Sequence, residues 1–256
     1  MAQFLVLPSD ADAHETLDAA GLRLRLPEQK GCLEAVIGEA PEPSTARDGA
    51  STTYPDDGFP EQLELLEAGD VSINVDGVIT RLALNLFPPS GNASGVIYTT
   101  PDQSATPLPP ATDYTISATG SDAIPPLTIQ HEAPSALLDV TIGGTPLNHA
   151  SSFVGGQPLD FTWTEGELSD RVYVELADAD TSLSCAFADA DGSGTIPGAL
   201  TAKLDPQSVA RVSVHRVREV TRAQAPQRAA AMLEEPMVLE TMVRFDFELT
   251  SVLSVD

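Results

Sequence analysis

Two neighbouring stretches decide the fold of this chain: Leu159-Asp160-Phe161-Thr162-Trp163-Thr164 and Arg171-Val172-Tyr173-Val174-Glu175-Leu176. In both, large apolar side chains recur at every second position. Because successive side chains of a β-strand point to opposite faces of the sheet, this period of two predicts strands with one buried face. Such strands must bury their apolar faces against a second sheet. We therefore predict a β-sandwich whose core contains Phe161, Trp163, Val172, Val174, Phe245 and Phe247.

The alternation continues on both sides of these stretches. Upstream, the turn signal Asp76-Gly77 lies between alternating segments at 71–75 and 82–86, which predicts a β-hairpin. Downstream, the last strand predicts inward side chains at Val243, Phe245, Phe247 and Leu249, and outward side chains at Arg244, Asp246, Glu248 and Thr250. We predict an all-β fold with two antiparallel, immunoglobulin-like β-sandwich domains, at residues 68–134 and 135–256. An irregular N-terminal segment, residues 1–67, is expected to pack on the first domain.

Composition narrows the class of partner. The 256 residues include 38 acidic and 13 basic side chains, for a formal net charge of −25. This charge repels phosphate backbones and anionic lipid, so we expect no nucleic-acid partner. The local cluster of basic residues is expected to pair with the chain's own carboxylates; it comprises Arg211, Arg216, Arg218, Arg222 and Arg228. No window approaches the roughly 20 apolar residues of a transmembrane helix.

The compartment is predicted from composition, because the first residues lack the pattern of a signal peptide. Lysine occurs only at Lys30 and Lys203, and Thr, Ser, Pro, Gly and Asp dominate the expected surface positions. This indicates an extracellular or outer-membrane surface location rather than a cytoplasmic one. The two cysteines, Cys32 and Cys185, are then predicted to form a disulfide. Two buried free thiols are the alternative.

One local motif carries metal chemistry. The stretch Asp189-Ala190-Asp191-Gly192-Ser193-Gly194-Thr195 has the oxygen ligands and the glycine spacing that begin an EF-hand calcium loop. Position 12 of such a loop would be Leu200 in place of the usual glutamate. Asp178 and Asp180 could supply the missing oxygens. An ordinary hairpin turn is the other interpretation of the same residues. Calcium is the one cofactor that the sequence suggests, and no other cofactor is expected.

The second half of the chain resembles a known group of proteins. The resemblance lies in Leu159–Trp163, Asp170–Val174, Ser184–Phe187, Asp191–Pro197 and Val212–Arg216, and extends faintly over Ala68–Pro134. These stretches look like uncharacterised, export-directed surface proteins of myxobacteria and their deltaproteobacterial relatives. The resemblance implies tandem β-sandwiches on the cell surface, often lipid-anchored, and supplies no catalytic residues.

The remaining motifs favour a non-catalytic role. The sequence has no nucleophile elbow, zinc-protease helix or phosphate-binding loop, and its four histidines have no metal-ligand spacing. We therefore predict no enzyme activity, but a structural, adhesion or interaction module of a bacterial cell surface, whose partner is a protein or a surface glycan. A calcium- or glycan-binding module is the first alternative, and a hydrolase with an acidic site is the second.

Overall fold

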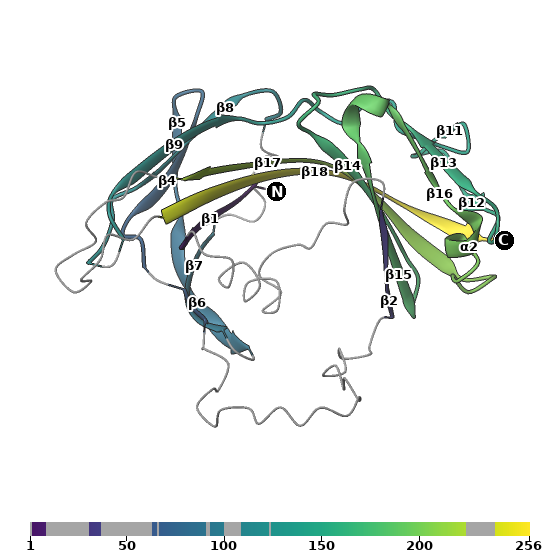
Figure 1. The fold of residues 1–256 in the computed structure, drawn as a ribbon, viewed down its shortest axis with the longest axis horizontal. Coiled ribbons are helices and arrows are strands. Elements are labelled where there is room, and N and C mark those ends of the chain that lie inside the picture. Colours follow the sequence, from purple (N-terminus) through teal and green to yellow (C-terminus); the bar gives the residue numbers. More distant parts are fainter. Residues whose placement is uncertain are drawn as a thin grey trace, which may run out of the picture. The chain divides into compact units, whose positions relative to one another are not determined.

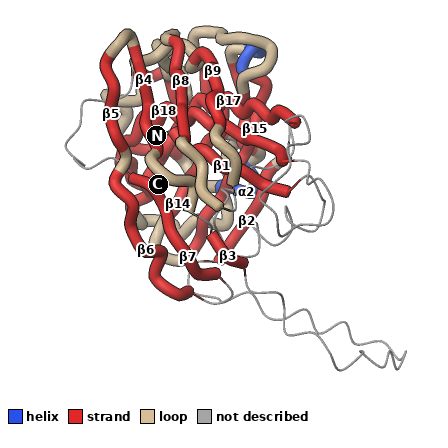
Figure 2. The backbone as a smooth tube through the Cα atoms, turned by 90° about the vertical axis from the view of Figure 1, so that its left-hand side faces the viewer, coloured by secondary structure: helices blue, strands red, loops and turns tan. Residues whose placement is uncertain are grey.

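The structure is a computed structural model, and it describes residues 2–8, 31–36, 63–65, 67–90, 93–99, 109–122, 124–223 and 239–256 (Figure 1). Strands make up most of this described chain, as the red segments of Figure 2 show. The predicted all-β class is confirmed. No helix among the described residues is long and apolar enough to span a membrane.

The described strands form four sheets, in which antiparallel pairing predominates. The long sheet has the order β1 (Ala2–Pro8), β18 (Leu239–Val255), β17 (Val209–Ala223), β14 (Arg171–Ala177), β15 (Thr181–Ala188) and β2 (Cys32–Val36), with β12 (Ser152–Phe153) parallel to β18. The short sheet has the order β11 (Thr145–Pro146), β10 (Thr141–Ile142), β13 (Leu159–Thr162) and β16 (Ser193–Ile196). The other two have the orders β5 (Val78–Arg81), β4 (Val71–Val75), β8 (Asp113–Ala118), β9 (Leu127–Glu132), and β3 (Leu63–Leu65), β7 (Ala93–Thr99), β6 (Ala83–Ser90). The helical segments η1 (Asp189–Asp191) and α2 (Gly198–Thr201) are short.

These elements divide between two compact units. The first unit contains β1 and β3 to β9, and the second contains β2, β10 to β16, η1 and α2. β17 and β18 contribute to both, since residues 218–223 and 239–246 belong to the first unit and residues 209–217 and 247–255 to the second. The units therefore differ from the continuous segments 68–134 and 135–256 that the alternation predicts. Alternation identifies a strand, but it does not show that one long strand serves two units.

The second unit has the layers of a sandwich. Side chains from the long sheet and from the short sheet belong to one buried cluster. The predicted core residues Phe161, Trp163, Val172 and Val174 all lie in it, each at most 5% exposed. Their strands form because the alternating apolar residues bury one face, as the burial pattern of β13 shows. The immunoglobulin-like topology within this class stays a prediction.

The last strand departs from its predicted faces. In β18 all five residues from Met242 to Asp246 are buried, including Arg244 and Asp246, while Leu249 is 41% exposed. The expected outward orientation of Arg244 and Asp246 into water is therefore wrong. Phe245 is buried in the first unit, where its ring contacts Tyr114 at 5.0 Å, and Phe247 is only partly buried. Charged residues at every second position of a sequence do not show whether both faces of the strand are buried.

A hairpin forms at the predicted turn in the first unit, but its second strand is β5 (Val78–Arg81) and not the predicted segment 82–86, most of which lies in β6 and pairs with β7. β4 and β5 are joined by Asp76 and Gly77, both with positive φ, at 51° and 81°. A two-residue turn of this kind requires left-handed backbone at both positions, which Gly and Asp tolerate better than most residues. The hairpin thus follows from two residues of sequence.

The N-terminal segment supplies strands as well. β1, β2 and β3 all lie within residues 1–67. The apolar run Leu33–Ile37 predicts a strand at the position of β2, whereas β1 and β3 fall where the sequence predicts irregular structure. β1 pairs with β18 in the first unit, and β2 pairs with β15 in the second. The partners of β1 and β2 are more than 140 residues away in the sequence, so the local pattern marks these strands weakly.

Candidate functional site

The predicted calcium loop connects β15 to β16. Its first residues form η1, and Gly192 follows in the left-handed conformation, with its N–H donating to the carbonyl of Asp189 at 3.1 Å. The Asp189 side chain is fully buried, whereas Asp191, Ser193 and Thr195 are exposed. The loop therefore places one of its predicted ligands in the interior and three at the surface.

Asp189 forms a buried ion pair with Arg216 of β17. The Arg216 Nε lies 2.7 Å from Oδ2 of Asp189, and its Nη2 donates to Oδ1 at 2.9 Å. Nη2 also donates to the carbonyl of Thr164. Burial raises the pKa of the Asp189 carboxyl, while the hydrogen bond and charge of Arg216 oppose that rise. Both carboxylate oxygens face the guanidinium, which stands where a bound cation would have to lie.

Two neighbours complete the surroundings of this pair. The indole Nε1 of Trp163 donates to the Asp189 carbonyl at 3.0 Å, which satisfies a buried polar atom of the core tryptophan. A Cβ atom built on Gly166 would lie 2.0 Å from Oδ2 of Asp189. The backbone at Gly166 thus packs directly against the carboxylate, and only glycine fits there without displacing the ion pair.

Asp178, a predicted ligand outside the loop, organises a turn. Its Oδ1 accepts the backbone N–H groups of Asp180 and Thr181 at 2.9 and 2.7 Å, and its Oδ2 accepts that of Asp205 at 2.8 Å. Burial alone would raise the pKa of Asp178, but these hydrogen bonds to the ionised form lower it below its usual value. Asp180 takes part through its backbone.

The surface members of the loop make short-range polar contacts. Ser193 Oγ donates to the carbonyl of Asp191 at 3.2 Å, and Thr195 Oγ1 donates to Oδ1 of Asp160 at 2.6 Å. Over the described residues, no three His, Cys, Asp or Glu side chains gather as a metal-ligand set. The structure gives the predicted ligands roles in turns and pairs, and calcium binding by this loop stays a prediction.

The basic cluster pairs within the chain where its side chains are described. Besides Arg216, Arg211 lies 3.8 Å from the carboxylate of Glu175, and Arg218 donates to the carbonyl of Glu132 at 3.2 Å. The side chains of Arg222 and Arg228 lie outside the described residues. The sequence holds one signal for the role of Arg216. Arg216 follows Val212 and Val214 at alternate positions, so its side chain is expected on the same buried face. A buried arginine requires a polar or charged partner.

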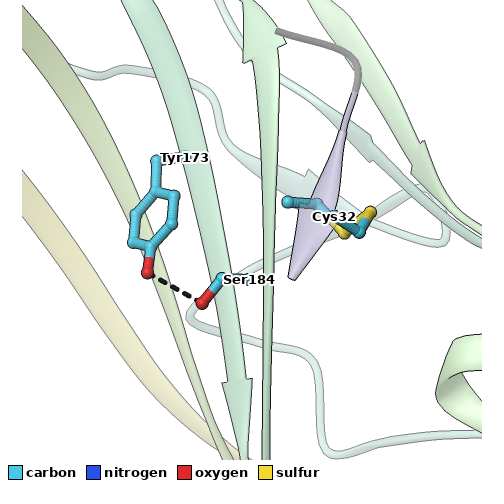
Figure 3. Close-up of a disulfide and its surroundings, with 4 residues drawn as sticks. Cys32, Tyr173 and Ser184 are labelled. Atoms are coloured by element: carbon cyan, nitrogen blue, oxygen red, sulfur yellow. Dashed lines mark hydrogen bonds between the residues drawn. A yellow bond between two sulfur atoms is a disulfide. The ribbon is translucent and has the colours of Figure 1, made fainter. Parts of the chain in front are cut away.

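The predicted disulfide is present. Cys32 of β2 and Cys185 of β15 are directly opposite in the register, with a Cα–Cα distance of 4.1 Å and a sequence separation of 153 (Figure 3). Cys185 belongs to the buried core cluster. The bridge therefore anchors an edge strand of the long sheet to the core of the second unit.

Polar side chains lie on the face of the long sheet opposite this core. Tyr173 and Ser184, which alternate with core residues of β14 and β15, share a hydrogen bond of 2.8 Å (Figure 3). The ring of His215 lies 5.2 Å from that of Tyr173, and its Nε2 is 3.9 Å from Oε1 of Glu248. Tyr173 and His215 are buried, and Ser184 is half-buried.

Four exposed aliphatic side chains occur close together in the sequence of the first unit, on two strands that belong to different sheets. Val78 and Ile79 of β5 are 68% and 67% exposed, and Leu84 and Leu86 of β6 are 45% and 80% exposed. The sequence predicts a strand at Leu84 and Leu86 but not at Val78 and Ile79, and the period of two does not show that the apolar side chains face water.

No protein-family model and no curated protein sequence matches this chain. The functional assignment therefore depends on the geometry of the described residues.

Proposed function

We propose that this protein is a non-catalytic structural or adhesion module of the bacterial cell surface, and that it binds a partner protein through the exposed edge strand β5. The observation that carries the proposal is that all four residues of the edge strand β5 are exposed, including Val78 and Ile79 at 68% and 67%. Each exposed aliphatic side chain loses the stabilisation that burial would provide. Large aliphatic side chains exposed on an edge strand favour a protein contact at that strand.

The backbone of β5 supports the same role. Among the described strands β5 has only β4 as a neighbour, so it is an edge of its sheet. Val75 and Val78 flank the two-residue turn, and Leu82 donates its N–H to Val71, which places Ile79 and Arg81 at the alternate positions. The N–H and C=O groups of these two residues therefore point away from β4. Such an edge can accept an added strand from a partner.

The disulfide supports a location outside the cytoplasm. Disulfides form and persist in oxidising compartments, and they are rare where glutathione and thioredoxin keep thiols reduced. Cys32 and Cys185 are the only cysteines of the chain, and both are in this bridge. An exported module that lacks cytoplasmic chaperones would gain stability from the cross-link.

Site-specific cross-linking in cells that make the protein tests this proposal. With the photo-cross-linking residue p-benzoylphenylalanine in place of Val78, irradiation should yield one defined protein adduct. In addition, Ile79→Pro should abolish the adduct, because it removes an outward N–H without disturbing the pairing with β4.

Leu168 offers the matched control. It is 92% exposed and lies in a loop of the second unit, so the same cross-linker there should give no such adduct. No adduct at position 78, or the same adducts at both positions, would contradict the proposed function.

A further inference from the structure

We propose that the second unit carries a binding pocket for an uncharged, hydroxyl-rich small molecule of the monosaccharide class. The pocket has a volume of about 340 Å³ and lies among the β10–β11 hairpin, β12 and residues 154–159. This volume falls within the range of about 300–1,000 Å³ that is usual for small-molecule sites. The inference is independent of the proposed function, which concerns the first unit.

The floor of the pocket is apolar. Ile142, Phe153 and Leu159 line it, and each is also part of the buried core of the second unit. Side chains that are fixed in a close-packed core hold their positions when a ligand arrives. The floor therefore offers a rigid surface for the C–H face of a sugar ring.

The rim is polar and exposed. His149, Ser152 and Gln157 line the pocket and are accessible to water, and Thr145 and Ser151 add two more hydroxyl groups. Hydroxyl, amide and imidazole groups both donate and accept hydrogen bonds. This matches the hydroxyl groups of a sugar, which also do both.

Among the residues that the structure describes, the pocket lining carries no carboxylate, ammonium or guanidinium group. None of its residues is Asp, Glu, Lys or Arg, although the whole chain has 38 acidic side chains. A charged ligand would lose its hydration in this pocket without gaining a counter-charge. The geometry thus favours a neutral ligand over an anionic sugar, a nucleotide or a cation.

Backbone hydrogen bonds hold the walls in place. Gly143 at the hairpin turn donates its N–H to the carbonyl of Asp160 at 2.8 Å, and Gly155 donates to that of Asp256 at 2.9 Å. β12 pairs with β18 at Ser152 and Phe153. A pocket formed in advance lowers the ordering cost of binding.

Saturation-transfer NMR on the full chain tests the proposal directly. The probes are glucose, galactose, mannose and N-acetylglucosamine, each at millimolar concentration, with glucuronic acid as the charged comparator. We expect saturation transfer to at least one neutral sugar and markedly less to glucuronic acid. No transfer to any of the four neutral sugars, or equal transfer to glucuronic acid, would overturn the proposal.

Variants place the signal in the pocket. Ser152→Phe should fill it and abolish transfer, whereas Thr128→Phe, at an exposed strand position of the first unit, should leave transfer unchanged. Gln157→Ala, which keeps the backbone, should weaken binding about three- to tenfold through one lost hydrogen bond. Transfer that persists in a folded Ser152→Phe protein, or that Gln157→Ala leaves unchanged, would show that the sugar binds elsewhere or not at all.

Discussion

At the scale of single residues, the Arg216–Asp189 pair joins three segments of the second unit: β17, the turn at η1 and the loop at Thr164. Removing two charges from water costs several kcal/mol for each ion, and only close, well-directed contacts offset that cost. The 2.9 Å hydrogen bond from Nη2 to Oδ1 is well directed, Nε lies 2.7 Å from Oδ2 as a close charge contact, and Gly166 packs against the carboxylate. The pair therefore specifies where the turn docks on the sheet.

This role predicts the effect of removing one partner. Asp189→Ala should lower the free energy of unfolding by about 3–5 kcal/mol, because it leaves the Arg216 guanidinium buried without a counter-charge. Replacing both residues, by Asp189→Val with Arg216→Met, should restore most of that loss. Urea unfolding of the three proteins, in the presence of a chelator, measures the difference.

The same variant separates the pair from the calcium hypothesis. If Asp189 were a calcium ligand, Asp189→Ala would have little effect in chelator and would instead remove a rise in melting temperature caused by millimolar calcium. If Asp189→Ala leaves the free energy of unfolding in chelator unchanged, the structural role of the pair is contradicted. A loss of about 3–5 kcal/mol in the free energy of unfolding in chelator supports the structural role.

At the scale of elements, β2 is an edge strand that only β15 holds in the described sheet. The Cys32–Cys185 bridge lies at the register position where the two strands face each other. A short edge strand gains little from its own packing, since only one side of it is hydrogen-bonded. The disulfide thus contributes a large share of the attachment of β2.

Removing both sulfur atoms should loosen this strand selectively. The double variant Cys32→Ala with Cys185→Ala should lower the free energy of unfolding by about 2–5 kcal/mol. Hydrogen exchange measured by mass spectrometry should become faster in residues 31–36 and stay slow in β14, which has strands on both sides. Unchanged protection of residues 31–36 would show that pairing alone holds β2.

At the scale of the whole molecule, the net charge of −25 acts on every part of the chain. Like charges repel more strongly in the compact state than in the expanded unfolded chain. Salt weakens this repulsion, because the screening length falls from about 30 Å at 0.01 M to about 10 Å at 0.1 M ionic strength. The buried Arg216–Asp189 pair is shielded from this effect, but the surface is not.

The melting temperature should therefore rise with salt. Calorimetry in sodium chloride at about 0.01 M and 0.1 M should show the higher melting temperature at the higher concentration. Sodium chloride screens charge without a specific site, and an equal concentration of a neutral osmolyte serves as the control. A melting temperature that falls with salt would show that favourable ion pairs outweigh the net repulsion.

The sequence by itself determined the features that depend on neighbouring residues. The period of two identified the core strands around Phe161 and Val172, because side-chain direction alternates within any strand. Asp76-Gly77 determined the hairpin through its backbone preferences. With only two cysteines in the chain, a disulfide could join only Cys32 to Cys185.

The tertiary structure alone decided which distant groups meet. The local motif predicts that Asp189 is a calcium ligand. In the structure it pairs with Arg216, which lies 27 residues away in the sequence and is positioned by β17. Likewise, the alternating sequence of β18 indicates one buried and one exposed face. In the fold, residues 242–246 are all buried, whereas residues 248–250 are all exposed. Burial and charge pairing depend on contacts between segments far apart in the chain, and local periodicity carries no information about those contacts.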